Sequence, residues 1–203
     1  MKTILIGALI VGAVAVGAEQ LRITVYNKAG ILDQEKESVV VSLSRIFRHA
    51  GIEIDWVAGV PRAPESSLMI YEPLRKGNEL EMACRARRDI ALDILPFGTS
   101  KQILGMAQPF ARTGLNVRIY GYGVRDAAAR ELRPYATVLS HAIAHEIGHV
   151  LLRSNSHTGR GLMSAVWTAR EYDWMGKEAL FFTPEDSRKM RFALSGVACS
   201  SFD

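Results

Sequence analysis

The segment that most constrains the fold of this chain is residues 136–152, where a helical apolar pattern contains the string H-E-I-G-H at 145–149. The apolar residues recur at steps of three and four, which predicts a helix with one buried face. Residues four apart on a helix lie on the same side about one turn apart, so both histidine side chains can reach one metal ion. We therefore expect a helix that presents His145, Glu146 and His149 to a cleft.

The residue types in this string suit metal-assisted hydrolysis. Imidazole nitrogen is a good ligand for Zn²⁺, and a catalytic zinc typically has three protein ligands and keeps one position for water. Glu146 directly follows the first histidine, where its carboxylate can act as general base on that water. His157 lies beyond the polar run 153–156 and is expected to be the third ligand. The string could also arise by chance on a surface helix, but here an apolar stripe and a downstream histidine accompany it.

These residues, followed by a methionine, resemble the metzincin metallopeptidases, whose motif is H-E-x-x-H-x-x-G-x-x-H with a later Met-turn. The resemblance is specific over about residues 136–167 and is closest to uncharacterised bacterial secreted zincin-like proteins with an H-E-I-G-H-x-L-L-x-S-N-x-H…G-I-M segment. It implies a secreted zinc-dependent endopeptidase, with Zn²⁺ as its cofactor and a peptide or protein as its substrate. The implied site residues are the zinc ligands His145, His149 and His157, the general base Glu146 and the Met-turn residue Met163.

The chain departs from the metzincin motif between the helix and the third histidine. Leu152 stands at the glycine position and Asn155 at the position of the third ligand, so His157 comes two residues late. Because imidazole is a better zinc donor than a neutral amide oxygen, we expect His157 to bind the metal. Asn155 tolerates a left-handed backbone and is expected to form the reversal of the chain after the helix.

Other assignments of the ligands and of the function remain open. Glu171 or Asp173 could be the third ligand, as in gluzincin-type peptidases, although no motif of that family surrounds them. The chain could also be a catalytically inactive, zinc-stabilised secreted binding module, but a structural zinc site needs no base such as Glu146 and usually fills all four positions. His141 is expected to be buried and hydrogen-bonded, because three ligands at successive four-residue steps, the last two being His145 and His149, would span about 12 Å.

The segment Leu104-Gly105-Met106-Ala107 is similar to the substrate-binding edge strand that lines the metzincin cleft. An edge strand can bind an extended peptide through backbone hydrogen bonds. Gly105 would allow a close approach of the backbone, and Pro109 is compatible with an edge strand or a strand end but not with the centre of a sheet. Without the resemblance, the segment fits an ordinary core strand equally well.

The N-terminal segment predicts the compartment. Lys2 supplies a positive charge, residues 3–18 are small or apolar apart from Thr3, and Val16-Gly17-Ala18 is an acceptable cleavage site. We expect a signal peptide over residues 1–18 and a secreted or periplasmic mature chain of residues 19–203. A membrane-spanning helix needs about 20 apolar residues, so an uncleaved anchor is the less favoured alternative, and no other stable membrane partner is expected.

Cysteine and charge content limit the remaining functions. Cys84 and Cys199 are the only cysteines, and in an oxidising compartment they form either one disulfide or two free thiols. The formal net charge of +4 comes from dispersed basic residues with one short run at 85–88, so we expect no nucleic-acid partner.

The remaining pattern is that of one α+β domain. Alternating and apolar segments predict strands near 21–26, 52–56, 90–95, 103–108 and 115–120. Further helices are predicted from Asp33 to about residue 50 and from Pro184 to about Leu194. The short connections around the first helix imply that the first two strands pair in parallel. The aromatic residues of 167–182 are expected to pack in the core; alternatively they form the wall of a specificity pocket, and Tyr172 could stabilise the oxyanion. The resemblance adds that residues 19–203 form a single metzincin-like catalytic domain, with a twisted mixed sheet, an active-site helix and a small C-terminal subdomain.

Overall fold

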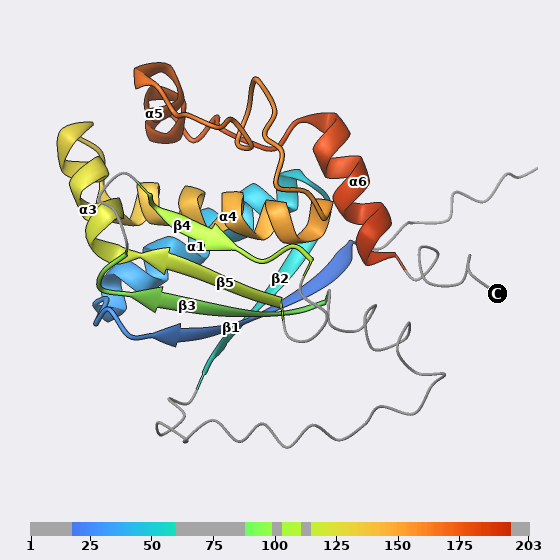
Figure 1. Cartoon of the computed structure of the whole chain (residues 1–203), viewed down its shortest axis with the longest axis horizontal. Coiled ribbons are helices and arrows are strands. Elements are labelled where there is room, and N and C mark those ends of the chain that lie inside the picture. The colour runs from blue at the N-terminus through green and yellow to red at the C-terminus, as the bar shows by residue number, and fades with distance from the viewer. Residues whose placement is uncertain (1–17, 60–87, 99–102, 111–114, 196–203) are drawn as a thin grey trace, which may run out of the picture.

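The computed structural model describes residues 18–59, 88–98, 103–110 and 115–195 (Figure 1). Residues 1–17 of the predicted signal peptide, Cys84 and Cys199 lie outside the described residues, so the cleavage site and the disulfide stay predictions. The described strands are β1 (Glu19–Asn27), β2 (Ile52–Ala58), β3 (Asp89–Leu95), β4 (Gly105–Ala107) and β5 (Leu115–Tyr120). The described helices are α1 (Asp33–His49), α3 (Gly121–Arg130), α4 (Tyr135–Leu152), α5 (Ala169–Gly176) and α6 (Pro184–Leu194).

The five strands form one sheet in the order β2-β1-β3-β5-β4. β1 pairs in parallel with β2 and β3, and β3 pairs in parallel with β5, whereas β4 runs antiparallel to β5. The predictions of an α+β fold with a mixed sheet, and of a parallel pair flanking the first helix, are therefore confirmed. β4 is the last strand in the order, so its second edge has no strand partner among the described residues.

The core lies on the face of the sheet where alternate residues are apolar. In β1, Leu21, Ile23 and Val25 are buried, whereas Arg22 between them is exposed. α1 and α4 contact each other, and Figure 1 shows them on the same side of the sheet. The apolar stripe of α4 includes Val138, Leu139, Ile143 and Ile147, and all four side chains are fully buried. Burial of this stripe against the sheet is what fixes the rotation of α4 about its own axis.

Local sequence signals explain which helices could be predicted. α6 begins after Thr183, whose hydroxyl oxygen accepts a hydrogen bond from Asp186 N–H at 3.1 Å, as its sequence indicated. α3 was not predicted, because its sequence contains two glycines, which lower helix propensity. α5 was missed because it has only eight residues. Its first turn nevertheless carries a recognisable signal, the capping box of Thr168 and Glu171.

The C-terminal segment, residues 153–195, contains α5 and α6. Figure 1 shows α5 on the side of α4 away from β1 and β3, while α6 contacts both α4 and β1. The guanidinium of Arg191 donates to Ala50 O at 2.6 Å, and that of Arg88 donates to Leu194 O at 2.6 Å, so the last turn of α6 is joined to the sheet half. None of the helices in the described ranges is long and apolar enough to cross a membrane. α4 thus lies between the sheet and the C-terminal segment.

Candidate metal centre

His145 and His149 lie one turn apart on α4, and both side chains are buried. His145 Nδ1–H donates to Leu162 O at 2.8 Å, and His149 Nδ1–H donates to Ser154 O at 2.7 Å. A carbonyl oxygen can only accept, so each neutral ring carries its proton on Nδ1 and a lone pair on Nε2. Both Nε2 atoms are therefore available as metal ligands.

The two Nε2 atoms lie 3.1 Å apart. With no proton on either atom, this contact joins two lone pairs and is unfavourable unless a cation lies between them. Two nitrogens bound to a tetrahedral zinc at ~2.0–2.1 Å are about 3.3 Å apart. Burial lowers the pKa of His145 to about 4 and also lowers the pKa of His149, so near neutral pH neither ring takes up a second proton. The pair fits one metal ion.

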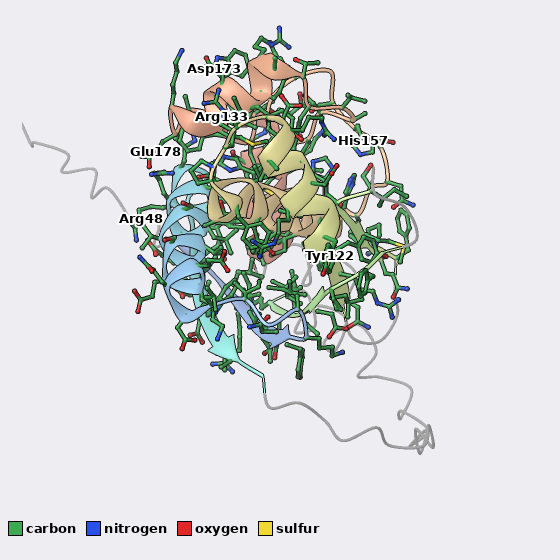
Figure 2. All side chains as sticks on the ribbon, turned by 90° about the vertical axis from the view of Figure 1, so that its left-hand side faces the viewer. Arg48, Tyr122, Arg133, His157, Asp173 and Glu178 are labelled. Atoms are coloured by element: carbon green, nitrogen blue, oxygen red, sulfur yellow. The ribbon has the colours of Figure 1, made fainter. Side chains whose placement is uncertain are left out.

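His157 completes a group of three. The ring nitrogens of His145, His149 and His157 that could bind a metal all lie within 4.8 Å of one another. His157 is exposed, and Figure 2 shows it on the side of the molecule away from α1. Within the described ranges, no other three histidine, cysteine or acidic side chains come close enough to share an ion. The structure therefore brings together the three histidines that the sequence predicted as ligands, and this cluster could bind zinc.

The chain reverses directly at the end of α4. Arg153 has a φ of 47°, in the left-handed region, and Ser154 N–H bonds back to His149 O at 3.2 Å. The expectation that Asn155 forms the reversal is wrong, because the left-handed residue is Arg153, two positions earlier. The reversal must come at once for the carbonyl of Ser154 to reach the ring of His149.

The turn that contains Met163 packs against α4. It begins at Gly161, whose φ is 73°, and Met163 is fully buried. A Cβ atom on Gly148 would lie 2.5 Å from Met163 Sδ, so the sulfur occupies the space that the missing side chain leaves on the helix between the two histidines. Thr158 N–H donates to Met163 O at 2.9 Å, which holds the preceding residue, His157, beside this turn.

Glu146 lies between α4 and the edge strand. It is half-buried, and burial raises the pKa of its carboxyl to about 7. A Cβ on Gly105 would lie 2.7 Å from Glu146 Cγ and 2.9 Å from Arg118 O, so a glycine is needed at this point of β4. The strand predicted to bind a peptide thus passes directly beside the carboxylate that was predicted to be the general base.

The alternative ligands have other roles. Glu171 is buried, and its carboxylate accepts from Thr168 N–H at 2.9 Å and from the Thr168 hydroxyl at 2.6 Å. Desolvation opposes ionisation of Glu171, but the hydrogen bonds outweigh it and lower the pKa to about 2. Asp173 pairs with Lys177 at 2.7 Å and with Arg133 at 3.6 Å (Figure 2). Neither carboxylate belongs to the histidine group, so the gluzincin alternative gains no support.

Two residues near the histidines were not predicted to be ligands. His141 is buried, and its Nδ1–H donates to Thr137 O at 2.7 Å, in agreement with its predicted structural role. Trp167 was expected to pack in the core or to line a specificity pocket, whereas its indole N–H donates to Leu162 O at 3.2 Å, the same carbonyl that orients His145. No sequence motif marks Trp167; the nearest local signal is the helix cap that follows it.

A cavity of about 280 Å³ lies elsewhere, between α1 and the carboxyl ends of β1, β2 and β3. Its lining is mainly apolar, with Trp56 and Leu139 among the larger side chains and Asn27 and Lys36 as polar members. Neither the three histidines nor Glu146 line it. The metal centre therefore lies outside this cavity and is identified by its chemistry.

No protein-family model matches the chain, and no curated protein matches it in sequence. Its fold is similar to that of a zinc-dependent peptidase from Methanocorpusculum labreanum, with 12% identity, a TM-score of 0.52, and coverage of 83% of this chain and 99% of that one. It is also similar to that of archaemetzincin from Methanopyrus kandleri, with 15% identity, a TM-score of 0.53, and coverage of 90% and 99%. At these identities the likeness concerns the fold.

Proposed function

We propose that this chain is a secreted zinc-dependent endopeptidase of the metzincin type. The observation that carries the proposal is the convergence of three histidine rings, two of them with facing Nε2 lone pairs 3.1 Å apart, beside a half-buried carboxylate on the same helix. A structural zinc site does not need that carboxylate, whereas zinc-dependent hydrolysis needs a general base.

His145, His149 and His157 would hold the zinc through their ring nitrogens. Three protein ligands with one position left for water are typical of a catalytic zinc. When bound, zinc lowers the pKa of its water and polarises the carbonyl of the peptide. Met163 packs against the helix that carries two of the ligands and would support the floor of the site.

Glu146 would accept a proton from the attacking water and later donate it to the leaving amine. Burial already raises its pKa to about 7, and a group with a pKa near the working pH exchanges protons in both directions. β4 would hold the substrate as an added strand, through backbone hydrogen bonds along its free edge. The absence of a side chain at Gly105 leaves room for the carboxylate beside that strand.

The comparisons support the coarser part of this proposal. Two proteins of similar fold are a zinc-dependent peptidase and an archaemetzincin, which agrees with metal-dependent peptide hydrolysis. The metzincin type rests on the third histidine and on the turn at Met163. The secreted or periplasmic location rests only on the composition of residues 1–18.

The test is metal content together with peptide cleavage. The chain is purified from a secreting host without chelators, and native mass spectrometry is expected to find one zinc per chain. Glu146→Gln keeps the shape of the side chain and leaves all three histidines in place. We expect this variant to retain zinc and to lose at least about 10²-fold in the rate of peptide hydrolysis, the usual scale for a general base.

The same experiment separates the alternatives. A folded wild-type chain without metal would reject the peptidase proposal. Zinc with no hydrolysis of any peptide in a broad library would favour the inactive binding module instead. Hydrolysis that is unchanged in Glu146→Gln would place the base elsewhere.

A further inference from the structure

The carbonyl oxygen of Leu162 accepts two hydrogen bonds at the metal centre. One comes from His145 Nδ1–H at 2.8 Å and the other from the indole N–H of Trp167 at 3.2 Å. A carbonyl oxygen has two lone pairs, so these donors together use its accepting capacity and fix its direction. The amide of the same residue, Leu162 N–H, donates to Phe181 O at 2.9 Å. Leu162 is therefore held on both sides.

The indole of Trp167 is itself held between two other rings. Its centroid lies 5.5 Å from that of His145 at an interplanar angle of 90°, and 6.2 Å from that of Tyr172 at 89°. Edge-to-face contacts at such distances are favourable between aromatic rings. Tyr172 is buried, so it forms a fixed support for the indole.

The start of α5 sets the position of Trp167 in the chain. Thr168 is the N-cap of α5 and forms a capping box with Glu171. Trp167 directly precedes the cap, and Tyr172 is the fourth residue of the helix, which are the two positions of a hydrophobic staple. The capping box and the staple together fix the angle at which the chain enters α5. The short helix therefore holds the indole at one place beside His145.

We propose that Trp167 is a positioning residue for His145, acting through the carbonyl of Leu162. This inference rests on the proposed metal centre and adds to it a residue outside the ligand set. A carbonyl held by Trp167 keeps the proton of His145 on Nδ1 and leaves Nε2 for the metal. Without the indole donor the carbonyl is freer to turn, and the tautomer with a proton on Nε2, which has no lone pair on that atom for the metal, gains population.

The test is Trp167→Phe, which removes the N–H donor and keeps an aromatic ring beside His145. Zinc affinity is measured by competition with a chromophoric chelator, and the tautomer of His145 is measured by ¹⁵N NMR on the metal-free chain. We expect the affinity to fall about 10–100-fold, the range typical of outer partners of ligands, and the Nε2–H tautomer to increase. Trp174→Phe is the matched control, because Trp174 is a nearby tryptophan on α5 whose ring centroid lies 5.1 Å from Arg170 Cζ, and it is expected to change neither value.

The proposal would be overturned if the zinc affinity and the tautomer of His145 in Trp167→Phe equalled those in Trp174→Phe. If Trp167→Phe does not fold, Thr168→Ala is the second variant, because it removes the cap that holds Trp167 in place without changing a residue at the metal centre. Smaller changes in zinc affinity and in the tautomer of His145 would support the proposal, whereas no change in either would overturn it. A wild-type chain that binds no zinc, with a shifted tautomer in Trp167→Phe, would reject the proposed function and retain the positioning role.

Discussion

The two nitrogens of each helix histidine have separate partners. Nδ1 of His145 and of His149 donates to a backbone carbonyl, while the Nε2 atoms face each other at 3.1 Å. Such outer partners fix the tautomer and the direction of a metal ligand. Because the partners are main-chain atoms of Leu162 and Ser154, a change of either side chain leaves the hydrogen bonds possible. The orientation of the ligands therefore depends on the path of the backbone.

At the scale of single residues, the first prediction concerns the third metal ligand. We expect His157→Ala to lower zinc affinity by at least about 10²-fold, above the effect typical of outer partners, because it removes a ligand atom. Asn155→Gly is the comparison, since Asn155 is exposed and is not the residue that reverses the chain, and it should leave the affinity nearly unchanged. Chelator competition measures both. A larger loss in Asn155→Gly than in His157→Ala would assign the ligand to Asn155.

Gly105→Ala tests the contact between β4 and the predicted base. The new Cβ would lie 2.7 Å from Glu146 Cγ and 2.9 Å from Arg118 O, so either the carboxylate or the strand must move. A displacement of about 1 Å at a reacting group can lower the rate by as much as about 10²-fold. We expect hydrolysis to fall about 10–100-fold with zinc content unchanged. Val41→Ala, at an exposed position of α1, is the control and should retain the wild-type rate.

At the scale of elements, α4 and the turn at Met163 form one packed unit. Gly148 is not needed for helix geometry and in fact lowers helix propensity, by about 1 kcal/mol relative to alanine. Its position is explained by Met163 Sδ and Phe182 Cε1, which would lie 2.5 Å and 2.9 Å from a Cβ there. In this chain, the second unspecified position of the H-E-x-x-H string, Gly148, is therefore constrained by packing.

Gly148→Ala is the prediction for this unit. Overpacking a buried site typically costs about 1–3 kcal/mol, which exceeds the gain in helix propensity. We expect the free energy of unfolding to fall by up to about 2 kcal/mol in denaturant titrations of the metal-free chain, by the difference of these two effects. Gly159→Ala is the control, because a Cβ at Gly159 meets no atom within 4 Å. Higher stability in Gly148→Ala would mean that Met163 can move aside without cost.

At the scale of the whole molecule, α4 is enclosed by the sheet on one side and by the C-terminal segment on the other. His141 lies within this enclosure, where it is bonded to Thr137 O and fully buried. Burial lowers the pKa of His141 from 6.5 to about 4, against the opposing effect of that hydrogen bond. A protonated His141 is therefore disfavoured in the folded chain and permitted in the unfolded one.

The consequence is a loss of stability in acid. The folded pKa is below the unfolded pKa, so the contribution of His141 is complete above pH 6.5 and is lost as the pH falls toward 4. Between pH 7 and pH 5 this one group should lower the free energy of unfolding by about 2 kcal/mol. His145 acts in the same direction, and Glu146, whose pKa is raised, acts in the opposite one.

The variant His141→Asn isolates this contribution. Asparagine retains an N–H donor for Thr137 O and does not titrate. Denaturant titrations of the metal-free chain at pH 8, 7 and 5 are expected to show that the variant lacks about 2 kcal/mol of the acid loss, the amount assigned to His141. Between pH 8 and pH 7 the free energy of unfolding should change by the same amount in the variant and in the wild type. An acid loss in the variant as large as in the wild type would assign the effect to other groups.

Much of the fold follows from local patterns. The three- and four-residue spacing in 136–152 predicts α4, and the alternation in 21–26 and 52–56 predicts β1 and β2, because amphipathic periodicity is a property of adjacent residues. Helices without such a signal were missed: α3 contains glycines, and α5 is short. The signal peptide and the disulfide between Cys84 and Cys199 remain predictions from composition alone.

The sequence by itself determined which side chains can carry the chemistry, because the spacing of His145, Glu146 and His149 on one helix is a local matter. Tertiary structure alone decided the rest of the site. Gly105 on β4 meets Glu146, Met163 fills the space beside Gly148, and the carbonyl of Leu162 orients His145. These outcomes depend on packing between segments that lie far apart in the sequence. The space that the other segments leave selects the small residues, the carbonyl directions and the turns of the site, and no local periodicity of the sequence predicts that space.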